Sequence, residues 1–278
     1  MRTWFITGAT RGFGALIAKE ALSRGDAVVG TGRRAEGVTE AIGAHPNLLA
    51  AALDVTREAD AVTAVEQAVA RFQRIDVLVN NAGFGLLGAV EETSGAEVER
   101  LFATNVFGLL AVTRAVLPVM RRQRSGHIMN LSSIGGYRAG AGFGVYSSTK
   151  FAVEGLSESL AAELAPLGIH VTVVEPGYFR TDFLDQTSLV RTERILSDYD
   201  ATVGKLRGHV ADLNHAQPGN PRKLATAMMA LADEKKPPVR LALGSDTVRA
   251  IEEKNAFVAG ELATFRSLSL STDFGPGE

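Results

Sequence analysis

The sequence predicts a doubly wound α/β fold, in which a mostly parallel seven-stranded sheet carries helices on both faces. Two observations support this prediction. Short apolar runs of strand length alternate with stretches of helical periodicity along most of the 278 residues. The first such run ends in a glycine-rich turn that opens a helix. With 46% hydrophobic residues the chain can bury one large core, and we expect residues 1–278 to form a single domain.

The first strand, at residues 4–7, leads into the turn Thr7-Gly-Ala-Thr-Arg-Gly-Phe-Gly14, and helical periodicity follows up to Gly25. Glycines in such a turn let the backbone approach a pyrophosphate and direct amide groups and the positive end of the helix at it. The order of strand, turn and helix indicates a dinucleotide site. Its candidate residues are Gly8, Thr10, Arg11, Gly12, Phe13 and Gly14.

The second strand, at residues 27–31, ends in Gly32-Arg33-Arg34. It has no acidic residue where an NAD-selective fold places one for the ribose 2′-hydroxyl. Arg11 and Arg33 stand instead where a 2′-phosphate would lie, and they favour NADP(H). The alternative is that both arginines are ordinary solvated surface residues.

Two further strands are expected at residues 48–53 and 76–80. The first runs into Asp54 and Val55, and Asp54 also suits the N-cap region of a helix that starts near Arg57. A long helical stretch at about 96–122 contains Asn105. An asparagine inside an apolar helix needs a hydrogen-bonding reason to be there, and one such reason is a satisfied amide in the core.

The residues with the clearest chemistry follow a strand at 127–133 that ends in Ser133. Tyr146 and Lys150 are spaced i, i+4 on one helix face. A cation about 5 Å from a phenolate stabilises it by roughly 3 kcal/mol, or about 2 pKa units, at an effective dielectric of about 20. We therefore expect Tyr146 to act as a general acid/base near pH 7.

The same helix carries a stripe of small residues that permits close packing of an internal helix or of another subunit: Ser148, Ala152, Gly155, Ser159 and Ala162. A strand at 170–174 follows. Residues 183–220 are polar and weakly helical, and segments of this length are usually functional or mobile. A helix at about 221–232, a strand at 239–243 and helical character beyond Ile251 complete the chain, with disorder expected at 271–278.

These motifs together resemble the classical short-chain dehydrogenases/reductases, which have a Rossmann-type fold. The resemblance covers roughly residues 2–245 and leans towards the subgroup similar to 17β-hydroxysteroid and retinol dehydrogenases. It implies catalytic roles for Asn105, Ser133, Tyr146 and Lys150. It also implies that Tyr146 and Lys150 contact the cofactor, together with Asp54, Val55, Asn81, Ala82, Gly83, Pro176, Gly177 and Thr181.

The function implied is hydride transfer between NADP(H) and a carbonyl/secondary alcohol pair. In that mechanism Ser133 would hold the substrate oxygen, Lys150 would lower the pKa of Tyr146, and Asn105 would position a relay water. Residues 183–220 would cover the substrate, and the protein would be a homo-dimer or homo-tetramer. The alternative is a dinucleotide-binding sensor or scaffold without turnover. Candidate pocket residues are Gly135, Tyr137, Phe143, Tyr178, Phe179 and Phe183, which suggest a largely apolar substrate.

Composition argues against several other classes of protein. A formal charge of −2 with interspersed signs gives no basic footprint for nucleic acid. The chain has no cysteine, and its five histidines show no ligand spacing, so we expect no metal site. No unbroken run of 18 apolar residues and no signal peptide are recognisable, and we expect a cytoplasmic protein.

Overall fold

The computed structural model describes residues 1–275. Its centre is a seven-stranded sheet in the order β3-β2-β1-β4-β6-β7-β9, with all neighbours parallel. The strands are β1 (Thr3–Ile6), β2 (Ala27–Gly32), β3 (Leu48–Ala52), β4 (Val77–Asn80), β6 (Gly126–Leu131), β7 (Ile169–Pro176) and β9 (Arg240–Leu243). Strand order reverses between β1 and β4, which creates a crevice at their carboxyl ends. The predicted fold class is confirmed.

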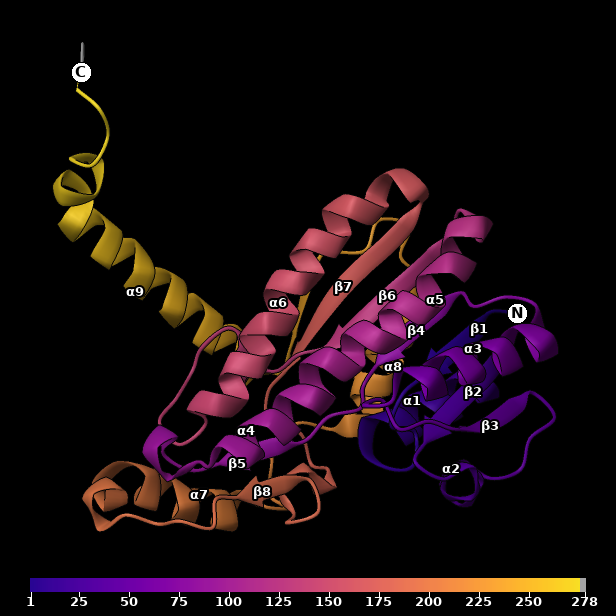
Figure 1. Ribbon diagram of the computed structural model, residues 1–278, viewed down its shortest axis with the longest axis horizontal. Coiled ribbons are helices and arrows are strands. Elements are labelled where there is room, and N and C mark those ends of the chain that lie inside the picture. The colour runs from indigo at the N-terminus through magenta and orange to yellow at the C-terminus, as the bar shows by residue number, and fades with distance from the viewer. Residues whose placement is uncertain (276–278) are drawn as a thin grey trace.

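Helices cover both faces of this sheet (Figure 1). One face carries α3 (Glu58–Phe72), α5 (Leu109–Gln123) and α6 (Gly144–Leu164), and the other carries α1 (Gly12–Ser23), α2 (Ala35–Ile42) and α8 (Pro221–Asp233). Successive side chains of a strand point to opposite faces. Phe5 of β1 therefore joins the first buried cluster, whereas Trp4 and Ile6 join the second.

The helical stretch expected at 96–122 is continuous but not uniform. α4 (Gly95–Phe102) passes into a π-helical segment, Ala103–Gly108, and then into α5. Asn105 lies in this segment, and single π-helical turns are frequent at functional sites. Although the sequence shows no unbroken apolar run, Gly95–Gln123 is long and apolar enough to cross a membrane. Half of its most apolar window is buried inside the fold, as in a core helix.

The segment at residues 183–220, named the cover here, is more structured than its sequence suggests. It contains β8 (Leu189–Arg191) and α7 (Lys205–Leu213), and β8 pairs in parallel with β5 (Gly85–Leu87). Glu92, which is buried, accepts a hydrogen bond from the backbone N–H of Leu196 and forms an ion pair with Arg207. Backbone pairing and a buried ion pair therefore fasten the cover to the body of the protein.

The last helix, α9 (Ser245–Leu270), begins against β9 and the turn at residues 134–136 and then leaves the body (Figure 1). It starts six residues before the helical character noted beyond Ile251. Residues 271–272 form a turn and 273–275 continue without helix or strand, whereas 276–278, the rest of the segment expected to be disordered, lie outside the described residues.

Candidate active site

A cavity of about 1020 Å³ lies at the carboxyl ends of the central strands. Most of the residues singled out from the sequence line it. They are Gly8, Thr10, Arg11, Gly12, Phe13, Arg33, Asp54, Val55, Asn81, Ala82, Gly83, Ser133, Gly135, Phe143, Tyr146, Lys150, Pro176, Gly177, Tyr178, Phe179, Thr181 and Phe183. Gly14, Asn105 and Tyr137 do not line it. One cavity thus brings together the glycine turn, the Ser-Tyr-Lys set and the expected pocket wall.

The glycine turn suits a phosphate group. Gly8 and Gly12 have φ values of +66° and +55°, in the left-handed region that favours glycine. A Cβ on Gly14 would lie 2.4 Å from the carbonyl oxygen of Gly8, so this glycine permits close packing. No side chain caps the start of α1. The N–H groups of its first turn are therefore available to an anion in the cavity.

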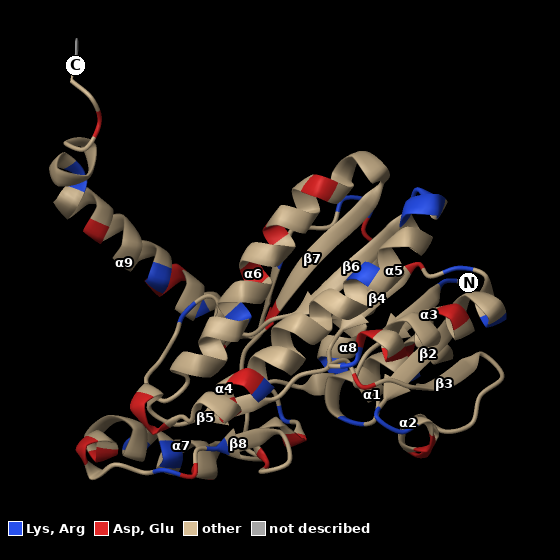
Figure 2. Ribbon diagram, in the orientation of Figure 1, with Lys and Arg blue, Asp and Glu red and all other residues tan. Residues whose placement is uncertain are grey.

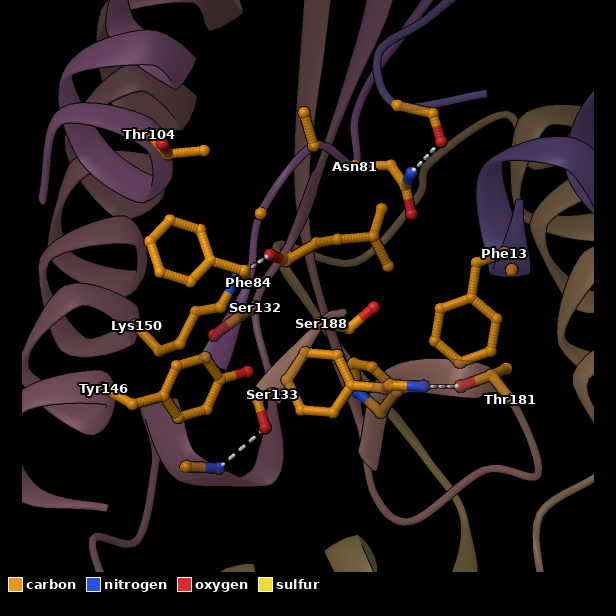
Figure 3. A pocket seen from close by; sticks show the side chains of 18 of the residues that line it. Phe13, Asn81, Phe84, Thr104, Ser132, Ser133, Tyr146, Lys150, Thr181 and Ser188 are labelled. Carbon is orange, nitrogen blue, oxygen red and sulfur yellow. Dashed lines mark hydrogen bonds between the residues drawn. The ribbon is translucent and has the colours of Figure 1, made fainter. Parts of the chain in front are cut away.

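The end of β4 holds this turn in place. Thr7 Oγ1 accepts hydrogen bonds from the backbone N–H groups of Asn81 at 2.9 Å and Ala82 at 3.0 Å. Asn81 Nδ2 donates to the carbonyl oxygens of Thr7 at 2.9 Å and Gly8 at 3.1 Å, and Figure 3 draws one hydrogen bond of this side chain. These bonds fix the turn relative to the centre of the sheet.

Asp54 fits both interpretations that the sequence left open, a place in the N-cap region of a helix and a contact with the cofactor. Its Oδ1 accepts hydrogen bonds from the backbone N–H of Thr56 at 3.0 Å and the Thr56 hydroxyl at 2.7 Å. This turn leads into α3, whose N-cap is Arg57. Asp54 also lines the cavity, so its structural role leaves it in reach of a ligand.

Ser133, Tyr146 and Lys150 lie together on one wall of the cavity (Figure 3). Ser133 Oγ accepts a hydrogen bond from the N–H of Gly135 at 3.1 Å, which leaves the hydroxyl proton free to be donated. The Tyr146 ring is 7% exposed, and Phe143 and Phe183 flank it at centroid distances of 6.0 and 5.9 Å. Lys150 Nζ donates to the carbonyl oxygen of Leu131 at 2.7 Å.

The electrostatics of this set differ from the expectation. Burial raises the pKa of Tyr146 to about 12, and the hydrogen bond with Ser133 only partly opposes it. Burial also lowers the pKa of Lys150 to about 8, against the attraction of Glu154. The prediction that Tyr146 has a lowered pKa is therefore wrong in its net direction, because desolvation of the phenolate outweighs any stabilisation by the charge of Lys150. At pH 7 Tyr146 carries its proton and Lys150 is charged.

Asn105 matches the alternative of a satisfied core amide. It is 2% exposed, and its Nδ2 donates to the carbonyl oxygen of Phe84 at 2.9 Å and to Thr149 Oγ1 at 3.2 Å. Its Oδ1 accepts from the N–H of Phe84 at 3.1 Å. With both N–H groups used, only Oδ1 has capacity left. The contact between Asn105 and a relay water stays a prediction.

The two arginines near the glycine turn are in different situations. Arg11 donates to the hydroxyl and the carbonyl oxygen of Thr187, both at 2.9 Å, and so contacts the cover. Arg33 is exposed, and within the described part of the chain its side chain has no hydrogen bond or ion pair. Arg33 is therefore the arginine free to receive an anion.

Sequence reasoning missed a buried acidic cluster behind Lys150. Glu154 and Glu175, 4% and 1% exposed, both pair with Arg240, and the distance to Glu175 is 2.8 Å. Burial raises the pKa of Glu154 to about 7, and the nearby Glu175 carboxylate adds to the effect. Glu154 follows Lys150 by one helical turn. This i, i+4 spacing was the only signal available in the sequence.

Glu154 should make stability pH-dependent. Burial raises its pKa to about 7 in the fold, from the ordinary glutamate value of 4.5. Between these values the folded state holds more protons than the unfolded state, so stability falls as pH rises. The melting temperature of the wild type should therefore fall between pH 5 and pH 7. In Glu154→Gln this fall should be smaller by about a few degrees. Glu158→Gln, which alters an exposed partner of Arg240, is the control. Equal slopes in wild type and Glu154→Gln would contradict this assignment.

Comparison with known proteins agrees with this geometry. The family profile described as "short chain dehydrogenase" matches residues 2–191. The crystal structure of a short-chain dehydrogenase from Streptomyces avermitilis is 42% identical and covers 98% of this chain and 100% of its own, with a TM-score of 0.91. Residues 245–278 make up about an eighth of the chain, so this alignment extends along α9.

The names of two other similar proteins mention a substrate or a cofactor. The 3-ketodihydrosphingosine reductase of Bacteroides thetaiotaomicron is 40% identical over 240 residues, which is 86% of each chain. The structure titled "ElxO with NADP Bound" is 27% identical and covers 89% of this chain and 99% of its own, with a TM-score of 0.73.

Proposed function

The chain belongs to the short-chain dehydrogenase/reductase family, and we propose that it is an NADP(H)-dependent oxidoreductase that interconverts a carbonyl group and a secondary alcohol. Because a fold alone does not imply an activity, the proposal rests on the site. Its main support is the meeting of Ser133, Tyr146 and Lys150 on one wall of the cavity that the glycine turn also lines.

The residues divide the chemistry between them. The nicotinamide, when bound, supplies or accepts the hydride. In reduction, Ser133 donates a hydrogen bond to the substrate oxygen, and Tyr146 transfers its phenolic proton to that oxygen as the carbon is reduced. The O–H bond of Tyr146 breaks and that of the alcohol forms. The charge of Lys150 then stabilises the phenolate. A neutral Tyr146 at pH 7 suits reduction.

The pocket favours a largely apolar substrate. Apart from the cofactor-side residues, the lining includes the side chains of Phe84, Phe143, Phe183, Val190 and Leu206. Burying a long alkyl or aromatic group against them is favourable by about 25 cal/mol per Å². The Bacteroides relative is named as a reductase of 3-ketodihydrosphingosine, which supports a ketone as the substrate class.

A substrate series tests the activity directly. NADPH oxidation should be measured with 3-ketones of increasing chain length, and kcat/KM should rise with each added methylene until the pocket is full. Each buried methylene contributes about 0.8 kcal/mol, or about fourfold. NADPH binding without turnover of any aldehyde, ketone or quinone would instead support the sensor alternative.

Cofactor preference should depend mainly on Arg33. A 2′-phosphate accepts charge-assisted hydrogen bonds of about 1.5–3 kcal/mol each. Arg33→Ala should therefore reduce the preference for NADPH over NADH by about tenfold or more. Arg11→Ala should have a smaller effect because Arg11 already contacts Thr187. The measurement is the ratio of the two dissociation constants.

Arg34→Ala is the matched control, since Arg34 is the adjacent base, is exposed and does not line the cavity. An acidic substitution at Gly32 is a poorer test. Its Cβ would lie 2.5 Å from Thr10 Cγ2, so the side chain of Thr10, which lines the cavity, would have to move. A wild-type preference for NADH, or equal ratios in Arg33→Ala and Arg34→Ala, would contradict the proposed selectivity.

A further inference from the structure

A buried carboxylate lies one helical turn beyond Lys150 on α6. Glu154 follows Lys150 at the i, i+4 spacing, which puts both side chains on the same side of the helix, and both are buried. Lys150 Nζ donates to the carbonyl oxygen of Leu131. Glu154 Oε1 lies beside the next residue, because a Cβ on Gly136 would contact both Glu154 Oε1 and Ser132 Oγ. The ammonium and the carboxylate therefore reach adjacent residues at the end of β6.

The charges around Glu154 do not balance without Lys150. Arg240 forms ion pairs with the carboxylates of Glu154, Glu158 and Glu175. One arginine cannot neutralise three carboxylates, so negative charge remains when all of them are ionised. Water solvates the exposed Glu158, whereas Glu154 and Glu175 are buried. Figure 2 shows both signs of charge along α6, and Lys150 is the only Lys or Arg in the sequence of that helix. Lys150 is therefore the cation placed to compensate Glu154.

The protonation states of the two groups overlap in a useful range of pH. Burial lowers the pKa of Lys150 to about 8, and the attraction of the Glu154 carboxylate opposes this effect. Burial raises the pKa of Glu154 to about 7. Between about pH 7 and pH 8, therefore, most molecules carry both the carboxylate and the ammonium. The ionised form of Glu154 is present in the range where Lys150 would otherwise lose its proton.

Other titratable and charged groups surround this pair on the elements packed against it. They are Tyr146 and Glu158 on α6, Glu175 on β7, Arg240 on β9, and Tyr137 and Arg138 directly after the turn at residues 134–136. The ring of Tyr137 stacks on Arg240 at 5.5 Å, and Arg138 is paired with Glu253 of α9. Among these neighbours of Lys150, it is the Glu154 carboxylate that raises the pKa of Lys150.

We propose that Glu154 is a positioning residue that holds Lys150 in its charged form, the form that stabilises the phenolate of Tyr146 during reduction. Glu154 does not line the cavity, so it acts through Lys150 and not on a ligand. Its pairing with Arg240 fixes the carboxylate in place. The role of the charge in reduction rests on the proposed function. The effect of Glu154 on Lys150 requires no substrate and can be measured separately.

The first experiment measures the pKa of Lys150 by NMR of the full chain with ¹³C-labelled lysine. The Lys150 signal is identified by its loss in Lys150→Met. In Glu154→Gln the pKa of Lys150 should fall by at least about one pH unit, because a nearby opposite charge shifts a pKa by about 1–3 pH units. Glu158→Gln is the matched control, since it removes an exposed carboxylate from the same arginine. It should change the pKa of Lys150 by less than about half a pH unit.

Two results would overturn the proposal. One is an unchanged pKa of Lys150 in Glu154→Gln, and the other is an equal fall in Glu154→Gln and Glu158→Gln. Glu154→Asp and Glu154→Asn form a second matched pair, of equal length with and without the charge, which decides the question if Glu154→Gln does not fold. The pKa of Lys150 should be higher in the Asp variant than in the Asn variant, and equal values would contradict the proposal.

The second experiment follows the reaction. Because kcat/KM reports the ionisations of the free enzyme, it should decline with the same pKa of Lys150 that NMR gives. In Glu154→Gln the decline should begin about one pH unit lower than in the wild type, with values at pH 6 within a few-fold of each other. A decline at the wild-type pH, despite a lowered pKa of Lys150, would overturn the role of Glu154 in reduction. A wild type that reduces no carbonyl compound would contradict the proposed function, whereas the NMR result would still decide whether Glu154 keeps Lys150 charged.

Discussion

Replacing Tyr146 with phenylalanine should reduce kcat by about a hundredfold to ten-thousandfold, the range that a general acid contributes. Burial keeps the phenol protonated at pH 7, so the substitution removes the proposed proton donor of the reduction. The ring remains, and its packing against Phe143 and Phe183 should hold the pocket in shape. The affinity for NADPH should therefore stay within a few-fold of wild type. Single-turnover kinetics and fluorescence titration measure the two quantities separately.

Tyr178→Phe is the matched control for this variant. Tyr178 also lines the cavity, and the substitution removes the same atom from a residue to which no proton transfer is assigned. We expect its kcat to change by less than tenfold. A Tyr146→Phe variant as active as Tyr178→Phe would exclude the proposed proton donor, whatever the substrate.

Replacing Lys150 with methionine should lower kcat/KM by about a hundredfold. Its Nζ lies 5.9 Å from the centre of the Tyr146 ring, and a charge at that distance stabilises a phenolate by about 3 kcal/mol at an effective dielectric of about 20. The substitution also leaves the carbonyl oxygen of Leu131 without its donor. Affinity for the cofactor should fall as well, in contrast to Tyr146→Phe.

The pH profile gives this variant its own signature. Because the pKa of Lys150 is lowered to about 8, the ammonium is charged below that pH and neutral above it. Wild-type kcat/KM for reduction should therefore be constant up to about pH 7 and decline above pH 8. The decline should disappear in Lys150→Met and move to higher pH in Lys150→Arg, whose guanidinium stays charged. A wild-type profile that is flat through pH 8 would contradict the assignment.

The parts of this site that could be predicted from the sequence are those encoded by local spacing. The glycine turn is eight residues long and follows its strand directly, and Tyr146 and Lys150 are one helical turn apart. The sheet could be predicted because buried parallel strands are almost continuously apolar, as β1 and β4 are. In each case the physical requirement falls within one short stretch of chain.

The parts that could not be predicted depend on residues far apart in the sequence. Arg207 pairs with Glu92 across 115 residues, and Arg240 pairs with Glu154 across 86. β5 and β8 have three residues each, too few for a recognisable period. The pKa of Tyr146 differs from the prediction for a related reason. Spacing gives the distance to Lys150, but only the fold shows how completely both groups are removed from water.

The pairing of β8 with β5 bears on how enzymes of this architecture diversify. Backbone hydrogen bonds attach the cover there, so the side chains of β8 can change without breaking this attachment. Phe183, Val190 and Leu206 belong to this stretch and line the cavity, whereas the proton donor and the glycine turn are on other elements. Point substitutions along one surface segment can therefore shift which molecules are accepted while the reaction itself is inherited intact. Directed evolution of new substrate range should begin in that segment.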